Sequence, residues 1–269
     1  MKRTEMKNPL SEHIDTMSAE EMVRLMQSEY VKAAQAVEAA TADIARAVDG
    51  ISERMKRGGR LIYVGCGTSG RLGVLDASEC PPTFGVSPDL VVGIIAGGDA
   101  AMRRSVEGVE DDPEAGKAAL AALDITEADS VAGISAAGGA RYVLGALEAA
   151  RNVGALTVGI TCDADSPLSR QSDIAIVTDT GPEVVTGSTR MKAGSAHKTV
   201  LNMISTGVMI KLGMVYENHM INLRPLNEKL KKRMVKMTSD IAGVDAGRAG
   251  ELLERWNWDV RKAVEHKNG

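Results

Sequence analysis

The chain has 269 residues, which is enough for one large domain or for one domain with a small appendage. Its formal net charge of −4 and its aromatic content of 3% exclude the basic footprint and base-stacking platforms typical of nucleic-acid-binding proteins. The 3 cysteines show no C-x-x-C spacing, and there is neither an apolar run of membrane-spanning length nor a signal-peptide core, so we expect a metal-free protein of the reducing cytoplasm, away from membranes.

Two helices are predicted near the N-terminus, after a polar lead-in over 8–17. Ser18 and Glu21 form a capping box, which marks the start of the first helix. Apolar residues at helical spacing predict a second, long helix over 31–56. Its expected buried face consists of Ala33, Val37, Ala40, Ile44, Val48, Ile51 and Met55.

A short apolar strand over 61–64 leads into a glycine-rich turn, Gly65 to Gly70, and then into an amphipathic segment. Unpaired N–H groups and the partial positive charge of a helix N-terminus make such a turn an anion site, and the hydroxyls of Thr68 and Ser69 add two hydrogen bonds. No acidic residue follows at the distance that a dinucleotide requires, and the Walker lysine is missing. The turn therefore favours a sugar phosphate, with a tight turn that binds no ligand as the alternative.

Four more apolar runs predict strands over 90–95, 130–135, 155–161 and 173–177. Helical segments are expected over 100–106, 113–123 and 141–152, and a long helix over 191–212 follows a loop over 181–187. This alternation predicts an α/β fold, a three-layer sandwich with a five-stranded parallel sheet covered on both faces. The strands then end at one edge, where ligands of open α/β sheets bind.

The C-terminal part differs in character, so we divide the chain into a domain over 8–238 and a small module over 239–269. A basic helix is predicted over 226–237, and three short helices are predicted over 241–244, 249–256 and 260–264. We interpret the module as an accessory or interaction element, with Trp256 and Trp258 in its core or at an interface.

Four strings of residues carry a resemblance to a known family. The longest is the glycine turn followed by Leu75-Asp76-Ala77-Ser78-Glu79-Cys80-Pro81-Pro82-Thr83, and the others are Val106–Asp111, Glu183–Gly194 and Asn227–Leu230. They resemble the N-acetylmuramic acid 6-phosphate etherases over nearly the whole chain, and the glucokinase regulatory protein is a relative that shares much of the pattern. The resemblance implies a sugar isomerase-type, flavodoxin-like domain that forms a homodimer and uses no metal or organic cofactor.

The resemblance also implies a reaction. A phosphorylated amino sugar, N-acetylmuramic acid 6-phosphate, would lose its D-lactyl ether and give N-acetylglucosamine 6-phosphate and D-lactate. In the ring-opened sugar the C2 proton is α to the C1 aldehyde and the lactyl oxygen leaves from C3, so the elimination needs a base and an acid before water adds.

Glu79 and Glu110 are the candidate catalytic residues. Each follows a strand in a predicted loop or helix start, so we expect both to reach the same edge of the sheet. By resemblance Glu79 is the acid that protonates the departing lactate oxygen and Glu110 is the base at C2. The residues alone leave the acid and base assignment open, and Glu107 and Asp111 remain rivals for the second role.

The residues expected to hold the sugar phosphate come from the matching strings and from the loop after the third strand. They are Gly67, Thr68, Ser69, Gly70, Ser78, Ser135, Gly138, Arg141, Ser188 and Lys192. Lys192 and Lys198 lie near the start of a long helix, where each is either a substrate contact or a surface charge. His197 and His219 lack metal spacing, and we interpret both as packing or interface residues.

The loop after the third strand departs from the family pattern Ser-Gly-x-Thr-Pro. Ala137 and Ala140 stand where hydroxyls are expected, Gly139 replaces the usual Arg, and Arg141 replaces the usual Pro. Three accounts remain open: backbone amides with Ser135 hold the phosphate, Arg141 supplies a charge-assisted contact, or the ligand lacks a 6-phosphate.

Two other functions remain as alternatives. One is a catalytically silent sugar-phosphate sensor that acts through protein contacts, like the regulatory relative. The other is an aldose–ketose isomerase on the same fold, which needs a base but no acid for an ether. The presence of both Glu79 and Glu110 favours the etherase, and the altered loop over 135–141 favours the sensor or a different ligand.

Overall fold

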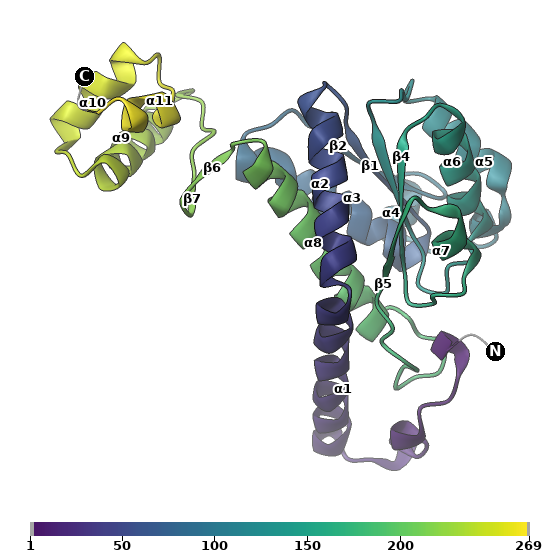
Figure 1. The fold of residues 1–269 in the computed structure, drawn as a ribbon. Coiled ribbons are helices and arrows are strands. Elements are labelled where there is room, and N and C mark those ends of the chain that lie inside the picture. Colours follow the sequence, from purple (N-terminus) through teal and green to yellow (C-terminus); the bar gives the residue numbers. More distant parts are fainter. Residues whose placement is uncertain (1–2, 268–269) are drawn as a thin grey trace. The chain divides into compact units, whose positions relative to one another are not determined.

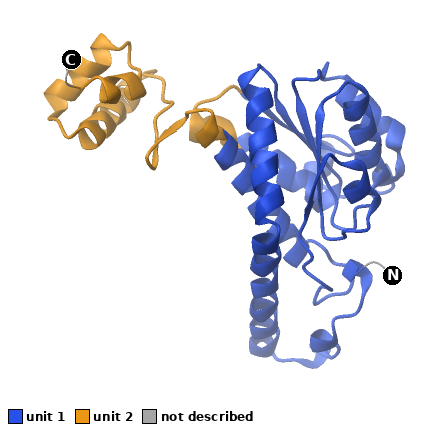
Figure 2. Ribbon diagram, viewed as in Figure 1, with its two compact units in different colours: residues 1–78, 88–208 blue, residues 79–87, 209–269 orange. Residues whose placement is uncertain are grey.

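The computed structural model describes residues 3–267. The chain divides into two compact units, Met1–Ser78 with Pro88–Val208, and Glu79–Ser87 with Met209–Gly269 (Figure 2). The boundary expected between residues 238 and 239 falls inside a helix, α9 (Glu228–Ala242), and the division into a domain over 8–238 and a module over 239–269 stays a prediction. Among the described residues, none of the helices combines the length and apolarity needed to cross a bilayer.

The first unit is built on a parallel sheet of five strands in the order β2-β1-β3-β4-β5, which confirms the predicted α/β architecture (Figure 1). The strands are β1 (Leu61–Gly65), β2 (Val91–Ile95), β3 (Ser130–Ile134), β4 (Leu156–Thr161) and β5 (Ile174–Val177). Every residue of β1, β3 and β4 is buried. Such strands are covered on both faces, which explains why their sequences are apolar runs and not alternating patterns.

Helices cover both faces of the sheet (Figure 1). One layer contains α5 (Pro113–Ala121), α6 (Arg141–Asn152) and α7 (Pro167–Gln171). The other contains α2 (Thr41–Lys56), α3 (Gly67–Phe84) and α8 (Lys192–Lys211). The short elements between them are α4 (Ala100–Arg103) and the 3₁₀ helices η1 (Arg3–Glu5), η2 (Pro9–Ser11), η3 (Ile14–Thr16) and η4 (Val109–Asp111).

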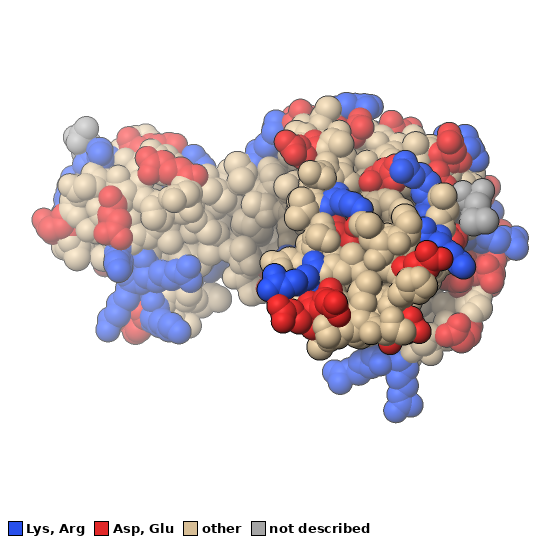
Figure 3. Space-filling model, turned by 90° about the horizontal axis from the view of Figure 1, so that it is seen from below, with Lys and Arg blue, Asp and Glu red and all other residues tan. Residues whose placement is uncertain are grey.

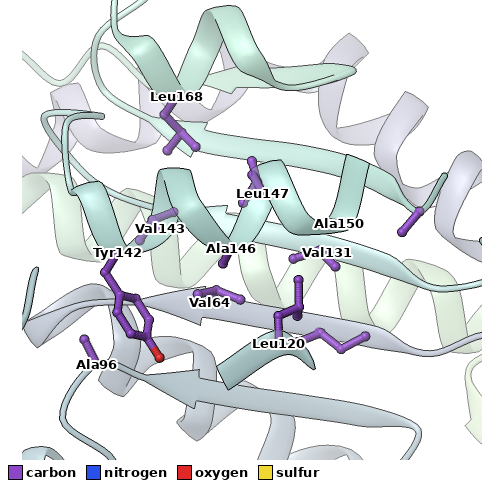
Figure 4. Close-up of a cluster of buried hydrophobic side chains, with 12 residues drawn as sticks. Val64, Ala96, Leu120, Val131, Tyr142, Val143, Ala146, Leu147, Ala150 and Leu168 are labelled. Carbon is purple, nitrogen blue, oxygen red and sulfur yellow. The ribbon is translucent and has the colours of Figure 1, made fainter. Parts of the chain in front are cut away.

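The apolar core between α6 and the sheet fixes the position of α6. Figure 4 shows side chains of α6 lying over those of β1 and β3 in this buried cluster. Two glycines allow α5 to approach closely, because a Cβ on Gly116 would lie 2.0 Å from the carbonyl oxygen of Tyr142, and a Cβ on Gly145 would lie 2.1 Å from that of Pro113. The N-terminus of α6 is thereby held at the carboxyl edge of the sheet.

A buried polar network joins β1, α3 and α8 in the opposite layer. The Tyr63 hydroxyl donates to one carboxylate oxygen of Asp76 at 2.9 Å, and Asn202 Nδ2 and Ser205 Oγ donate to the other at 2.6 and 3.2 Å. Asp76 is only 4% exposed, so these donors provide the hydrogen bonds that its carboxylate cannot make to water.

The N-terminal helices differ from the prediction at one point. The capping box is confirmed, since Ser18 Oγ accepts from the Glu21 amide at 3.3 Å and the Glu21 carboxylate accepts from the Ser18 amide at 2.7 Å. The single helix expected over 31–56 is wrong, because α1 (Ala19–Ala39) ends at Ala40 and α2 begins at Thr41. The Thr41 hydroxyl bonds to the carbonyl of Glu38 at 2.6 Å and so caps α1 without any glycine or proline as a signal.

The second unit contains the C-terminal helices and a short hairpin of β6 (Val215–Tyr216) and β7 (His219–Met220). The separate helix expected over 241–244 is wrong, because these residues form the end of α9 and its left-handed cap, Gly243 at φ 68°. The helices α9, α10 (Ala246–Arg255) and α11 (Val260–Glu265) share one apolar core, against which Trp256 and Trp258 pack.

The helix α9 carries the basic residues predicted for this region: Lys229, Lys231, Lys232, Arg233 and Lys236. Figure 3 shows Lys and Arg side chains gathered on one side of the C-terminal unit. The first unit shows both signs of charge on the face drawn there. No continuous basic surface of the kind that follows a nucleic-acid backbone is visible on that face.

Candidate active site

A cavity of about 450 Å³ opens in the first unit at the carboxyl edge of the sheet. Its walls come from the turns after β1 and β3, from η4, from the start of α8 and from the N-terminal segment. This is the edge at which parallel α/β sheets bind ligands, and the cavity lies at the edge where the sequence predicts ligand binding.

The turn after β1 forms one wall. Gly65 and Gly70 lie so close together that a Cβ on Gly70 would be 2.6 Å from the Gly65 carbonyl oxygen, and Gly67 has a φ of +51°. Gly67, Thr68 and Ser69 line the cavity, and their contact with the sugar phosphate stays a prediction. They begin α3, whose first amides have no intrahelical partners and therefore point their hydrogens at the cavity.

The loop after β3 forms a second wall, and two hydrogen bonds from β4 hold its position. The Cys162 amide donates to the Ala136 carbonyl at 2.9 Å, and Thr161 Oγ1 donates to the same oxygen at 3.2 Å. Gly138 is required by its φ of +63° and by the Ser166 hydroxyl, which lies 2.2 Å from where a Cβ would be. Ser135 lines the cavity, whereas Gly138 shapes the loop.

The departures in this loop are visible in the cavity wall. Ala137 and Ala140 line it with methyl groups where the family pattern has hydroxyls. Ala140 caps α6 without a side-chain hydrogen bond, so the first amides of α6 remain open to a ligand. Arg141 begins α6 with an exposed side chain and is not among the described residues that line the cavity, so its predicted phosphate contact stays a prediction.

Glu110 lies in η4, and both it and Asp111 line the cavity. Burial, together with the negative charges of Glu110 and Asp111, raises the pKa of the nearby Cys66 thiol to about 12, which places these carboxylates beside the β1 turn. Glu107 instead accepts a hydrogen bond from Ser105 Oγ at 2.6 Å and does not line the cavity. Of the two rivals for the second role, only Asp111 is in reach of this cavity.

Glu79 lies in a different place from the one the sequence predicts. It belongs to the second half of α3, ten residues after Ser69 (79 − 69), and not to a loop or helix start. A rise of about 1.5 Å per residue puts Glu79 about 15 Å from Ser69 along the helix. Its side chain is exposed, and Glu79 and Ser78 are not among the described residues that line the cavity. Ser78 donates its hydroxyl to the Leu75 carbonyl at 2.8 Å.

Lys192 is buried and is not a wall of the cavity. Its ammonium donates to Glu29 in an ion pair and to the Pro182 carbonyl at 2.7 Å, and both partners of the ion pair are only 2% exposed in their side chains. Burial alone would raise the pKa of Glu29, yet hydrogen bonds from Lys192 and Lys32 leave it below its usual value. Glu183 accepts from the amides of residues 192 and 193 at 3.1 and 3.0 Å and caps α8.

The cavity also contains residues that sequence reasoning missed. His197 lines it from α8 and is 1% exposed, and burial lowers its pKa to about 4, so its ring is neutral near pH 7. A signal was present, because His197 follows Gly194 by three residues and such residues share a helix face. Glu5 and Thr189 line the cavity too, and Ser188 is adjacent to Thr189 without lining it.

The charge of the cavity limits what it can bind and do. Its charged side chains are Glu5, Glu110 and Asp111, and no Lys or Arg occurs among the described residues of its wall. Within residues 3–267 there is also no His, Cys, Asp and Glu cluster that could hold a metal ion. An anion here must be held by hydroxyls and by the amides that begin α3 and α6, beside a carboxylate that can remove a proton.

Models of protein families match two overlapping parts of the chain. The glucokinase regulatory protein N-terminal SIS domain matches residues 43–151, and the SIS domain matches residues 107–212. Among solved structures, a phosphoheptose isomerase from Francisella tularensis has a TM-score of 0.57 at 17% identity, over 72% of this chain and 100% of that one. A phosphoheptose isomerase from Neisseria gonorrhoeae has a TM-score of 0.53 at 16% identity, over 74% and 100%. These likenesses support the fold.

Curated relatives are much more similar. An N-acetylmuramic acid 6-phosphate etherase from Caldanaerobacter subterraneus is 52% identical over 97% of this chain and 85% of its own length. Etherases of the same name from Clostridium beijerinckii and Salmonella agona are 52% and 48% identical, over 97% of this chain and 86% and 88% of their own lengths. With this similarity along almost its full length, the chain belongs to the N-acetylmuramic acid 6-phosphate etherase family.

Proposed function

We propose that this protein cleaves the D-lactyl ether of N-acetylmuramic acid 6-phosphate and releases N-acetylglucosamine 6-phosphate and D-lactate. The observation that carries the proposal is Glu110 in a cavity with the hydroxyls of Thr68, Ser69 and Ser135, in a chain about half identical to etherases of that name. A carboxylate beside an anion-binding wall is the arrangement that an elimination from a sugar phosphate requires.

In the proposed reaction, the amides that begin α3 and α6 hold the phosphate and Glu110 faces C2 of the open-chain sugar. Glu110 takes the C2 proton, a double bond forms between C2 and C3, and the bond from C3 to the lactyl oxygen breaks. A proton from the acid goes to the departing oxygen. Water then adds at C3 and a proton returns to C2. The net reaction consumes one water and gives D-lactate and a sugar with a free 3-hydroxyl.

The proposed acid, Glu79, comes from a second copy in this proposal, because α3 carries it about 15 Å along the helix from Ser69 and its side chain does not line the cavity of its own chain. We therefore propose a homodimer in which α3 of one subunit delivers Glu79 to the cavity of the other. Glu79 is exposed, and so is Leu75 one turn earlier at 47%. Exposed apolar side chains also border a groove between α1 and α8, where Tyr30 is 41% and Met203 is 47% exposed. Apolar surface of this kind marks protein–protein contacts.

The basic test is D-lactate release from N-acetylmuramic acid 6-phosphate by the purified protein. We expect Glu110→Gln and Glu79→Gln each to lower kcat by about 100-fold or more, the usual size of a general acid or base contribution. Ser78→Ala serves as a control at the neighbouring exposed position of α3, and we expect it to retain activity because the Ser78 hydroxyl donates to the Leu75 carbonyl of its own helix. Full activity in either glutamine variant would refute the assigned role.

A complementation experiment tests whether the two carboxylates come from different subunits. Mixing the Glu79→Gln and Glu110→Gln proteins and allowing subunits to exchange gives heterodimers in which one of two cavities has both carboxylates. We expect activity to return to about one quarter of wild type, since half of the dimers are mixed. In mixed dimers of a Glu79→Gln/Glu110→Gln double variant with wild type, neither cavity has both carboxylates, so only the wild-type homodimers in that mixture should be active. Failure of the single variants to complement would place both carboxylates in one chain.

A second candidate function is a sugar-phosphate sensor, or an etherase with altered phosphate recognition. The methyl groups of Ala137 and Ala140 and the absence of Lys or Arg from the described cavity wall favour it, as does the match to the regulatory protein domain. Tight binding of the phosphorylated sugar without D-lactate release would support the sensor. Release of D-lactate from unphosphorylated N-acetylmuramic acid would support an altered ligand.

We also propose a cytoplasmic location. Cys66, Cys80 and Cys162 form no disulfide, which is typical of proteins of a reducing compartment. The proposed substrate is a phosphorylated sugar, which does not cross membranes unaided.

A further inference from the structure

His197 is a buried residue of the cavity wall that the reaction above does not use. It is 1% exposed and lies on α8, and it lines the cavity together with Ser135 and Glu110. Its Nε2 atom lies 3.5 Å from Cys162 Sγ, behind the wall. Its Nδ1 atom has no hydrogen-bond partner among residues 3–267. Nδ1 is nevertheless absent from the unpartnered polar atoms that are fully buried, so part of its surface is accessible. The free nitrogen therefore opens on the cavity.

The neighbours of Cys162 determine which nitrogen carries the proton. Burial raises the pKa of the Cys162 thiol, so it keeps its proton. Thr180 Oγ1 donates to the sulfur at 3.8 Å, and Thr178 Oγ1 can donate to the Thr161 carbonyl at 3.5 Å. The S–H has two acceptors in reach, His197 Nε2 at 3.5 Å and Thr178 Oγ1 at 3.6 Å, and because an unprotonated imidazole nitrogen is the stronger acceptor we assign the S–H to Nε2. The ring proton is then on Nδ1, which is the nitrogen at the cavity.

His197 is also connected to the loop after β3, the cavity wall in which alanines stand where the family pattern has hydroxyls. Cys162, its partner, donates its amide to the Ala136 carbonyl at 2.9 Å, so the imidazole and the loop after β3 are attached to the same residue. In that loop Ala137 and Ala140 offer only methyl groups to the cavity. A ring N–H at this place supplies a donor where the loop lacks one.

We propose that His197 is a substrate-binding residue whose Nδ1–H donates a hydrogen bond to the phosphate of the sugar, in place of the missing hydroxyls. The inference rests on the proposed function for the identity of the ligand. Its role is to bind the phosphate and not to move protons at C2 or C3. Losing it should therefore weaken binding of phosphorylated sugars and leave the chemical step largely intact.

Two amide substitutions separate the two ring nitrogens. The amide of His197→Asn lies close to the position of Nδ1, whereas the longer side chain of His197→Gln places its amide near Nε2. We expect His197→Gln to raise KM for N-acetylmuramic acid 6-phosphate and Kd for N-acetylglucosamine 6-phosphate by about 10-fold, the usual effect of one hydrogen bond to a charged group. We expect His197→Asn to stay within about 3-fold of wild type, and kcat to change little in both. Unphosphorylated N-acetylglucosamine should bind both variants as it binds wild type.

Three results would overturn the inference. They are wild-type binding by His197→Gln, equal loss in both variants, and a fall in kcat at unchanged KM. Because binding of N-acetylglucosamine 6-phosphate is measured without turnover, it tests His197 even if the wild type releases no D-lactate, which would refute the proposed function separately.

A measurement on the unaltered protein removes the dependence on how the variants fold. Nitrogen-15 NMR of the His197 ring should show a protonated Nδ1, and N-acetylglucosamine 6-phosphate should shift the Nδ1 signal more than the Nε2 signal. A ring protonated on Nε2, or an Nδ1 signal indifferent to the sugar phosphate, would overturn the inference.

Discussion

At the scale of single residues, the cavity depends on side chains whose ionisation is set by burial. His197 is neutral and Cys66 keeps its proton, because burial opposes charge on both. The free energy that keeps them neutral appears in the pH dependence of stability. His197 has the clearer consequence, since its pKa of about 4 lies nearer to neutral pH than the value of about 12 for Cys66.

We expect His197 to make the folded protein less stable as the pH falls from 7 to 5. Its folded pKa of about 4 lies below the ordinary histidine value of 6.5, so in this range the unfolded chain binds a proton that the folded chain does not. Stability is complete above pH 6.5 and falls towards pH 4, by about 2 kcal/mol between pH 7 and pH 5. Urea unfolding at the two pH values should show this loss in wild type and a loss smaller by that amount in His197→Gln. An equal pH dependence in both proteins would show that His197 is not buried as a neutral ring.

At the scale of elements, α8 reaches the cavity because its start is fixed from two sides. Glu183 caps the first amides of α8, and Lys192 pairs with Glu29 of α1. Asn8 Nδ2 also donates to Glu29 at 2.8 Å and to the Pro182 carbonyl at 3.2 Å, so the N-terminal segment joins the same cluster. The cluster positions Gly194 and His197, which line the cavity one turn later.

This arrangement separates two roles for Lys192. Lys192→Met leaves the Glu29 carboxylate buried without its main partner, and we expect it to cost about 3–5 kcal/mol in the free energy of unfolding. The double variant Glu29→Leu/Lys192→Met removes both charges and should cost much less. Because Lys192 does not line the cavity, the folded fraction of Lys192→Met should keep the wild-type KM. A raised KM with near-normal stability would restore the sequence-based expectation that Lys192 binds the substrate.

The sequence predicts well those elements whose position is determined by a pattern within their own residues. The five strands are continuous apolar runs, and α6 begins and ends where its pattern predicts, at Arg141 and Asn152. The break at Ala40 has no such signal, because it comes from a threonine hydroxyl that bonds to a carbonyl of the preceding turn. Glu79 was expected in a loop or at a helix start, but α3 runs from Gly67 through Pro81 and Pro82 to Phe84, so Glu79 lies in the second half of a long helix.

The candidate site divides in the same way. Gly67, Thr68, Ser69 and Ser135 are found from sequence because strand ends and helix starts meet at one edge of a parallel sheet. Glu5 and His197 could not be found in this way. Glu5 lies about 60 residues before the first turn of the site, and His197 lies on α8, where tertiary packing decides which helix face meets the cavity. Lys192, for which a substrate contact was expected, is buried and forms an ion pair with Glu29.

At the scale of the whole molecule, the proposed chemistry needs two copies of the chain. One copy has Glu110 in the cavity wall, whereas its exposed Glu79 does not line that cavity, so in the proposed mechanism a monomer would have the base without the acid. Exposed apolar side chains on α1 and α8 provide a surface that a second copy would cover, and Val31 is among the most exposed at 55%. Assembly and activity should therefore be lost together.

Val31→Glu places a charge on that surface, and we expect it to shift the protein to a monomer and to remove D-lactate release, because burying an unpaired carboxylate at an interface is costly. Val153→Glu is the matched control, since Val153 is 43% exposed at the end of α6 in the opposite layer and should leave both properties unchanged. Light scattering gives the mass, and circular dichroism checks that both variants fold. The decisive case is a monomeric Val31→Glu protein with full activity, because Glu79 of the same chain, or another acid, would then have to protonate the departing lactate.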